Sequence, residues 1–371
     1  MEKITYVGLD IHRKTVVATA LSAEGTRIDQ RTLGPSREEL TRYLQELPGE
    51  DKRVVMEACT MWEPYFEAVE ASGATASLSH PLKTRLIAEA TIKTDTVDSA
   101  ALANLLRLEA IPRAYAPPPE LRRLRHLVRE RLFFRRSAAR MMNHIYAHWM
   151  HRGIPYETGC LRYAKGRKAA REGKIPEVDR ALDTLDHLLT KVKELDREIH
   201  AVYVVSKEAQ LLGTIPGLGE VVAVTLAAFL CPIERFANVE QVASYCGLVP
   251  TVHQSGESSY HGRLKRDCNH LLQSLLIEAS WNHRRHAARG TVGRVAMRVS
   301  RRRGKGKGAV AAAHKLAKIA YAVLKRGTAY TPDAPERPAA TRLAQNLRVA
   351  ARVCGQGTAL GPAAADRLLA Q

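Results

Sequence analysis

The chain has 371 residues, with 57 Lys or Arg against 38 Asp or Glu and a formal net charge of +19. Its hydrophobic fraction of 45% excludes a chain that is disordered throughout. The densest apolar run, residues 221–231, has about half the length that a bilayer span requires, which argues against a membrane protein. The length predicts two or three domains, and the basic excess indicates a polyanionic partner, most simply nucleic acid.

The charge is unevenly distributed along the chain. Residues 1–110 carry a net charge of −4, so the remaining residues carry +23. Basic side chains concentrate in residues 121–172 and 284–307. A basic run is often just a solvated face, but two runs beside an acidic module favour a surface that follows the backbone of DNA or RNA. The residues that we expect at this surface are Arg122, Arg123, Arg129, Arg135, Arg136, Lys165, Arg167, Lys168, Arg301, Arg302 and Arg303.

The first part of the chain has the pattern of an α/β domain. Three strand-like runs separated by short turns come first, at residues 4–10, 15–22 and 27–33. Helices and strands then alternate, with a helix at 36–47, a strand at 53–59, a helix at 62–72, a strand at 75–80 and a helix at 95–107. This order predicts a ribonuclease-H-like (RuvC-like) α/β domain over residues 1–112, closed by a linker that contains Pro112 and the three prolines at 117–119.

A helical region is predicted over residues 117–208. Its first helix, about residues 120–149, is basic, and a loop that is also basic is expected at 153–174. Apolar residues then recur at nearly heptad spacing, at Val178, Leu182, Leu185, Leu189, Val192, Leu195 and Ile199. The two segments together predict an antiparallel hairpin or coiled coil, and the stripe suits a dimerisation element as well as an ordinary packed helix pair.

The pattern changes again after residue 208. The turn Pro-Gly217-Leu-Gly219 between two helical segments is typical of a helix-hairpin-helix, whose backbone N–H groups face a phosphate. A structural corner between two helices is the alternative. We therefore expect Gly217 and Gly219 at nucleic acid, a mostly α-helical domain over 209–327, and a flexible tail over 328–371.

Four carboxylates of the first domain fall where the expected fold brings elements together. Asp10 ends the first strand, Glu57 ends the fourth, and Asp95 and Asp98 share one face of the last helix. In a ribonuclease-H-like fold the first and fourth strands are neighbours and this helix packs across the same edge. Converging anions require cations, and hard carboxylate oxygens suit Mg²⁺ or Mn²⁺. The four residues are thus the candidate metal ligands and catalytic residues.

Each carboxylate also has a simpler interpretation. Asp95 could cap its own helix, and Glu57 could pair with Lys83 or Arg85. The actin and sugar-kinase class shares the strand order, but residues 11–14 lack the Gly-Thr turn with which that class grips phosphate.

A serine-rich segment follows the helix-hairpin-helix pattern. It reads Gln-Ser255-Gly256, with Ser258 and Ser259 nearby as competing hydroxyls. A serine hydroxyl needs a base, a metal or an activated phosphate before it acts as a nucleophile, and Ser-Gly often marks a mere turn. The basic residues that follow and suit phosphate binding are Arg263, Lys265 and Arg266. Cys268 and His270 lack a second pair of metal ligands, so we interpret them as structural.

Over residues 4–285 the chain resembles the DEDD-type insertion-sequence transposases of the insertion-sequence 110 family, also called bridge-RNA-guided serine recombinases. The resemblance is carried, in the family's order, by Gly-Leu-Asp10, Met-Glu57-Ala, Thr-Asp95-x-x-Asp98-Ala, Pro-Gly-Leu-Gly219, Gly-Leu-Val-Pro250, Gln-Ser255-Gly256 and Gly262-Arg263. Taken singly these motifs are weak, but in this order they are highly specific.

The resemblance implies a composite active site. Asp10, Glu57, Asp95 and Asp98 would hold Mg²⁺, and Ser255 would attack a DNA phosphate to form a covalent phosphoserine link. The serine domain of one subunit would complete the metal domain of another, which requires a homo-oligomer, a dimer or a tetramer. A structured RNA encoded by the element would pair with both donor and target DNA.

Two other functions remain open from the sequence. One is a RuvC-like Mg²⁺-dependent endonuclease that uses water, and the other is a catalytically dead protein that binds RNA or DNA. Six cysteines without a C-x-x-C pair are typical of reduced thiols. The thiols predict a cytoplasmic protein, and the resemblance implies a bacterial one that is associated with the nucleoid and has no membrane partner.

Overall fold

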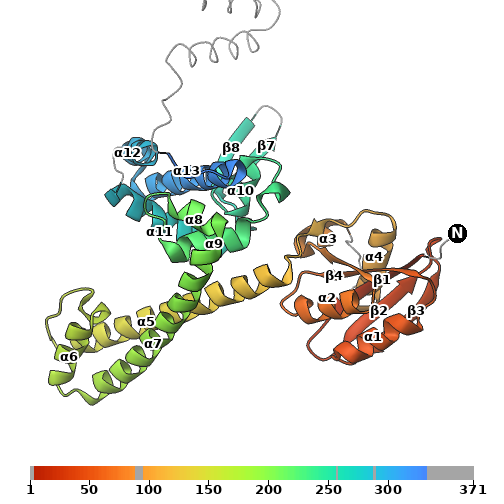
Figure 1. Ribbon diagram of the computed structural model, residues 1–371, viewed down its shortest axis with the longest axis horizontal. Helices are drawn as coiled ribbons and strands as arrows, with labels where there is room; N and C mark the ends of the chain where they lie inside the picture. The colour runs from red at the N-terminus through yellow and green to blue at the C-terminus, as the bar shows by residue number, and fades with distance from the viewer. Residues whose placement is uncertain (1–3, 88–94, 256–257, 287–289, 332–371) are drawn as a thin grey trace, which may run out of the picture. The chain divides into compact units, whose positions relative to one another are not determined.

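The computed structural model describes residues 4–87, 95–255, 258–286 and 290–331, without the side chains of 252–259, 261 and 284–286. The chain divides into two compact units, residues 1–118 and 119–371 (Figure 1). In the described parts of the chain, no helix is both long and apolar enough to cross a membrane. Most of the tail predicted at 328–371 lies outside the described residues.

The first unit is built on a six-stranded mixed sheet. Its strands are β1 (Ile4–Ile11), β2 (Val16–Leu21), β3 (Arg27–Leu33), β4 (Asp51–Glu57), β5 (Thr75–Ser79) and β6 (Arg113–Ala114). They lie in the order β3-β2-β1-β4-β5-β6. The first three strands pair antiparallel, whereas β1 with β4 and β4 with β5 are parallel. The first and fourth strands are therefore neighbours, as predicted, and the sheet is compatible with a ribonuclease-H-like fold.

Helices cover both faces of this sheet. They are α1 (Arg37–Glu46), α2 (Trp62–Ala71), α3 (Pro81–Ile87) and α4 (Asp95–Arg107). Alternate residues of a strand face opposite sides of a sheet. In β1, Val7 and Leu9 belong to one buried cluster with the residues of α1 and α2, while Tyr6 belongs to another with Leu102 of α4. The sheet thus separates α1 and α2 from α4.

The contact between α4 and β1 is unusually close at Gly8. A Cβ atom at this position would overlap the backbone oxygen of Ser99 and lie 2.6 Å from the backbone nitrogen of Ala103. Only a residue without a side chain allows this approach. Gly8 therefore fixes how near the first turns of α4 come to the strand that carries Asp10.

A buried polar network sets the position of α4 along the sheet. The hydroxyls of Thr19 on β2 and Ser99 on α4, both fully buried, share a hydrogen bond of 2.8 Å. Gln30 on β3 donates from Nε2 to the Thr19 hydroxyl at 3.0 Å and to the backbone carbonyl of Thr96 at 3.1 Å. Since buried polar groups are costly when unpaired, this network favours one position of the helix.

Two elements of the first unit are absent from the sequence-based expectation. Strand β6 has two residues and pairs antiparallel with β5 at a position that the sequence assigned to the linker region. Helix α3 has seven residues, and exposed Lys83 and Arg85 interrupt any apolar stripe. The proline at its first position, Pro81, is the one signal that a helix begins there.

The second unit begins with a long helical hairpin. Helices α5 (Pro119–His151) and α7 (Pro176–Val205) run antiparallel, since Arg131 pairs with Asp196 at 2.8 Å and Arg152 with Glu177 at 3.3 Å. The apolar stripe of α7 is buried except at Leu189, which is half-buried. The stripe packs within the chain; coiled-coil geometry and a role in dimerisation stay predictions.

The segment between these helices corrects one expectation. The sequence predicted a basic loop at 153–174, but a short 3₁₀ turn (Cys160–Arg162) and helix α6 (Ala164–Glu172) lie there. Arg167 and Arg171 donate to the carboxylate of Asp186 on α7, at 2.5 and 2.9 Å. Ion pairs to α7, rather than an apolar stripe of its own, fix this helix.

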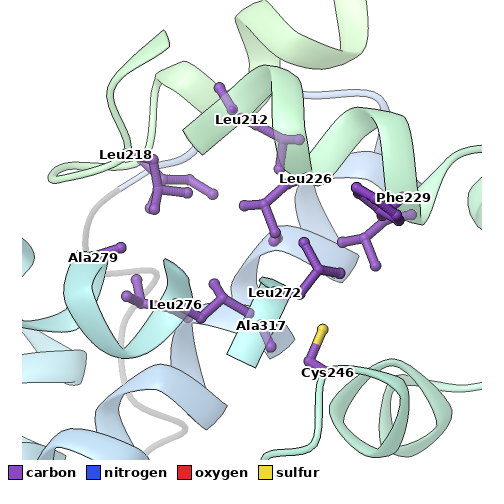
Figure 2. Packing of buried hydrophobic residues seen from close by; sticks show 14 of the residues in the cluster. Leu212, Leu218, Leu226, Phe229, Cys246, Leu272, Leu276, Ala279 and Ala317 are labelled. Carbon is purple, nitrogen blue, oxygen red and sulfur yellow. The ribbon is translucent and has the colours of Figure 1, made fainter. Parts of the chain in front are cut away.

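The rest of the second unit is mostly helical. Its elements are α8 (Lys207–Gly213), α9 (Glu220–Leu230), a 3₁₀ turn (Ile233–Arg235), α10 (Val239–Tyr245), β7 (Pro250–Ser255), β8 (Ser258–Leu264), α11 (His270–His286), α12 (Thr291–Arg303) and α13 (Lys305–Arg326). One large core joins the helices, and Figure 2 shows Leu226 and Phe229 of α9 packed with Leu272 of α11 and Ala317 of α13. The antiparallel hairpin of β7 and β8 carries the serine-rich segment.

Gly8 provides a test of the close packing. We expect Gly8→Ala to destabilise the first unit by about 1–3 kcal/mol, because the new methyl group must push α4 away from β1. Hydrogen exchange of residues 95–107 should accelerate. The control is Gly306→Ala, where no atom lies within 4 Å of the added Cβ. Equal stability of the Gly8 variant and the parent protein would contradict the packing argument.

Candidate functional site

The two strand carboxylates face the same side of the sheet. Tyr6 and Val55 pack in the cluster beneath α4, and Gly8 contacts α4 directly. Asp10 lies two residues beyond Gly8 and Glu57 two residues beyond Val55, so alternation places both on the α4 face. The strands pair in parallel with Leu9 opposite Met56, and the two acids come next along each strand. They are thus neighbours at one edge.

The two helix carboxylates lie in the first turn of α4, close to this edge. Asp98 is half-buried and lines a cavity of about 260 Å³ together with Asp10 and Glu57. Asp95 is more exposed, and its Oδ1 lies 3.4 Å from the imidazole of His12, which also contacts Asp10. Asp10 therefore lines the cavity with Glu57 and Asp98 and also contacts His12, which lies beside Asp95. The structure brings the four predicted carboxylates to the same edge of the sheet.

The electrostatic environment of Asp10 is that of a crowded anion. Burial raises the pKa of its carboxyl above the ordinary value, and the charges of Asp95 and Asp98 raise it further. A hydrogen bond of 3.0 Å with His12 Nε2 opposes these effects. The same hydrogen bond raises the pKa of His12 above its ordinary value. An arrangement that raises the pKa of a carboxylate in this way favours a bound cation.

The donor set fits a hard divalent cation. Carboxylate oxygens are the ligands that Mg²⁺ and Mn²⁺ prefer, and one or two carboxylates with bound water satisfy Mg²⁺. Asp10, His12 and Asp95 each offer one donor atom, and these three atoms all lie within 4.8 Å of one another. Glu57 and Asp98 add oxygens from the cavity side.

Two residues of this site were not identified from the sequence. His12 follows β1 by one residue in the turn to β2, and no ligand-spacing motif marks it. Arg85 of α3 lines the carboxylate cavity and was considered only as a partner for Glu57. The sequence does not predict helix α3, and this helix places Arg85 at the cavity wall. A guanidinium facing a carboxylate site suits a phosphate that would approach the metal.

A second candidate site is a basic groove in the second unit. A cavity of about 710 Å³ lies between α5 and the start of α11, lined by Arg129, Arg136, Arg140 and His270. Phe133 lies on the same wall and is 60% exposed. Guanidinium groups beside an exposed aromatic ring form a surface that holds phosphates and stacks bases. Arg129 and Arg136 were predicted contacts; Arg140 and Phe133 were not.

Two of the predicted basic contacts are corrected by burial. Arg122 is 4% exposed. Arg167 donates to Asp186 and, at 3.1 Å, to the carbonyl of Leu161, and its side chain is 14% exposed. A guanidinium already buried and bonded within the chain is not free to contact a phosphate. Arg122 is therefore assigned to the protein interior and Arg167 to the contact between α6 and α7, and neither to the proposed interface.

The remaining predicted basic residues are accessible to different degrees. Arg135 and Lys265 are half-buried, and Lys265 lies 3.9 Å from Asp267. The exposed ones are Arg123, Arg129, Arg136, Lys165, Lys168, Arg263, Arg266, Arg301, Arg302 and Arg303. The last three form the final turn of α12. Their contact with nucleic acid stays a prediction.

The glycine-rich turn between α8 and α9 is partly enclosed. Gly217 has a φ of 85°, and an added Cβ would lie 2.6 Å from the backbone nitrogen of His283 on α11. Gly219 instead faces open space and precedes α9. Of the two glycines, Gly219 alone is exposed, and a helix-hairpin-helix function stays a prediction.

Ser255 lies at the tip of the β7–β8 hairpin. It is the last residue of β7 and pairs in register with Ser258, while Gln254 pairs with Ser259. The side chains of these four residues lie outside the described part of the structure, so its role as nucleophile stays a prediction. The carboxylates belong to the first unit and Ser255 to the second.

A mixed sheet with acids near the ends of two adjacent strands and on the helix that crosses them is typical of the DEDD class of nucleic-acid-processing enzymes. Two family models match the chain. One, described as "Transposase" and built on the DEDD transposases of the IS110 group, covers residues 7–149. The other, described as "Transposase IS116/IS110/IS902 family", covers residues 209–292. The chain belongs to the IS110 family of DEDD transposases.

Relatives that match most of the chain agree with this assignment. A transposase for insertion sequence element IS1111A from Coxiella burnetii is 27% identical over 75% of this chain and 79% of its own length. A probable family 20 transposase from Pseudomonas aeruginosa is 26% identical over 89% of this chain and 99% of its own. The transposase for IS1328 from Yersinia enterocolitica is 22% identical over 89% and 100%. DNA is thus the substrate class.

The crowding of carboxylates can be tested by removing one charge. Asp98 raises the pKa of Asp10, so Asp98→Asn relieves repulsion. We expect the melting temperature without divalent cations to rise by about 1–3 °C, and the stabilisation produced by added Mg²⁺ or Mn²⁺ to disappear. Differential scanning calorimetry with and without the cation measures both.

The matched control for this test is Glu50→Gln. Glu50 is exposed and precedes β4 at the end of the strand opposite to Glu57. This variant should keep the full response to added cation. If Asp98→Asn also kept it, Asp98 would have to be removed from the site.

Proposed function

We propose that this transposase cuts and rejoins DNA through a serine–phosphate intermediate, with Ser255 as nucleophile and Asp10, Glu57, Asp95 and Asp98 as the metal site. The observation that carries the proposal is the convergence of acids from two strands and one helix beside Arg85. Such a site costs stability unless it binds cations, which argues for retention by function.

The chemistry divides between the two parts of the chain. A divalent cation held by the carboxylates would polarise the scissile phosphate and neutralise charge on the leaving oxygen. The Ser255 hydroxyl loses its proton, its Oγ forms a bond to phosphorus, and one P–O bond to deoxyribose breaks. The departing oxygen takes up a proton. In rejoining, a deoxyribose hydroxyl attacks the phosphoserine and restores the serine, so that the phosphodiester bond energy is conserved.

The same proposal includes a guide RNA and an oligomer. The accessible basic residues and the groove beside Phe133 provide surface for RNA in addition to DNA. Ser255 and the carboxylates lie in different units of the chain, so the serine of one subunit could serve the carboxylates of another. This arrangement would require a homo-oligomer, a dimer or a tetramer, held on nucleic acid.

A covalent adduct is the decisive test of the nucleophile. The protein is incubated with Mg²⁺, DNA of the element ends and RNA transcribed from the DNA that flanks the gene, and the products are separated under denaturing conditions. We expect a protein–DNA adduct that Ser255→Ala lowers by about 10³-fold or more, since the nucleophile itself is lost. Ser258→Ala, the register partner, serves as the matched control and should retain the adduct.

Each other outcome separates the alternatives. An adduct that persists in Ser255→Ala would overturn the serine assignment. Cleavage without an adduct would identify an endonuclease that uses water, and binding with neither product would identify a non-catalytic binding protein. Mixing Asp10→Asn with Ser255→Ala tests the shared site, because restored activity requires one intact half from each subunit. A reaction without the RNA tests whether the RNA is needed for the protein to act on the DNA.

The exposed arginines of α12 provide a test of nucleic-acid contact. We expect the triple variant Arg301→Ala, Arg302→Ala, Arg303→Ala to reduce the slope of log K against log salt by about 2–3. Fluorescence anisotropy with a labelled DNA duplex and a labelled RNA measures this slope. Arg167→Ala is the control, since this guanidinium is bonded to Asp186 and should leave the slope unchanged. An unchanged slope in the triple variant would remove α12 from the interface.

A further inference from the structure

The histidine beside the carboxylates has no role in the proposed function. His12 lies in the turn that joins β1 to β2, and its backbone N–H donates to the carbonyl of Thr15 at 2.9 Å. This hydrogen bond fixes the turn close to the end of β1. The imidazole, about half exposed, lies between two carboxylates that come from different elements, β1 and α4.

The distances in this group match those between ligands of one metal ion. Nε2 of His12 lies 3.0 Å from Oδ2 of Asp10 and 3.4 Å from Oδ1 of Asp95. Adjacent ligands of an octahedral ion with bonds of about 2.1 Å are separated by about 3.0 Å. All three donor atoms lie within 4.8 Å of one another. Both carboxylate oxygens therefore lie near the distance from His12 Nε2 that separates adjacent ligands of one octahedral ion.

We propose that His12 is a metal ligand, and that its nitrogen makes this site prefer Mn²⁺, or a similar first-row divalent ion, over Mg²⁺. The inference rests on the proposed metal site and adds a ligand to its four carboxylates. Mg²⁺ takes oxygen ligands almost exclusively, whereas first-row transition ions accept imidazole nitrogen alongside carboxylate. A site with carboxylates alone has no such preference built in.

The accessible position of His12 suits this role. A ligand that is exposed and held by a short turn can adjust to the ion without disturbing the core. The imidazole nitrogen that contacts the carboxylates is Nε2, the ring atom farther from the main chain. Asp10 is shared between this group and the cavity lined by Glu57 and Asp98, so an ion bound by His12 would be held next to the proposed reaction centre.

Electron paramagnetic resonance of bound Mn²⁺ tests the ligand directly. The full-length protein is loaded with Mn²⁺ alone, without nucleic acid, and electron spin-echo modulation is recorded. We expect coupling to a directly bound ¹⁴N nucleus, and its loss in His12→Gln. The same variant should weaken Mn²⁺ binding about tenfold and leave Mg²⁺ binding within about threefold, because glutamine offers an oxygen in place of the nitrogen.

The control variant is His80→Gln. His80 follows β5 and precedes α3, whose residues line the carboxylate cavity, so it is a second histidine in the same region of the first unit. This variant should retain the ¹⁴N coupling. Loss of the coupling in His80→Gln but not in His12→Gln would overturn the assignment, and so would tighter Mn²⁺ binding in His12→Gln.

The failure of this inference and that of the metal site can be told apart. Bound Mn²⁺ without ¹⁴N coupling would reject His12 as a ligand and leave the carboxylate site intact. If the parent protein bound no Mn²⁺, or if Asp10→Asn bound Mn²⁺ as well as the parent does, the metal site itself would be rejected, and His12 as a ligand with it. A melting curve of His12→Gln that matches the parent protein shows that the comparison concerns folded protein.

Discussion

The close approach of α4 to β1 is the constraint on which the carboxylate site depends. Gly8 has no side chain, so the backbone of α4 at Ser99 and Ala103 lies directly on the strand. Two of the four acids come from the first turn of this helix, and a third, Asp10, lies next to the last residue of the strand beneath it. An outward shift of α4 would separate Asp98 from Asp10. The Thr19–Ser99 hydrogen bond prevents the corresponding shift along the sheet.

The parts of the fold that the sequence predicts are those with a strong local pattern. Short runs rich in apolar residues identify β1 and β2, and the acids are recognised because they stand near the ends of such runs. Helix α6 has no such pattern, since it is held by ion pairs to Asp186, which lies elsewhere in the chain. Helix α3 is too short to show a helical pattern in the sequence, and without this helix the position of Arg85 at the cavity wall cannot be deduced.

The roles of the basic residues are also only partly predictable from the sequence. In the sequence, Arg122, Arg167 and Arg301 are equivalent members of basic runs. In the structure, Arg122 is buried, Arg167 is bonded to α7, and Arg301 is exposed on α12. Tertiary partners decide between these roles. The sequence does not identify His12 as a site residue. Its spacing from Asp10 is visible in the sequence, but its contact with Asp95 depends on how α4 packs.

Helix α11 connects two parts of the second unit that the sequence treats as separate motifs. At its end, Nδ1 of His283 donates to the carbonyl of Pro216 in the glycine-rich turn, at 2.5 Å. Near its start, Gln273 donates to the carbonyl of Gly247, in the segment that leads into β7, at 2.6 Å. The helix therefore fixes the separation between the glycine-rich turn and the segment that leads into β7. Any nucleic acid that contacted both motifs would have to match this separation, whatever sequence it carried.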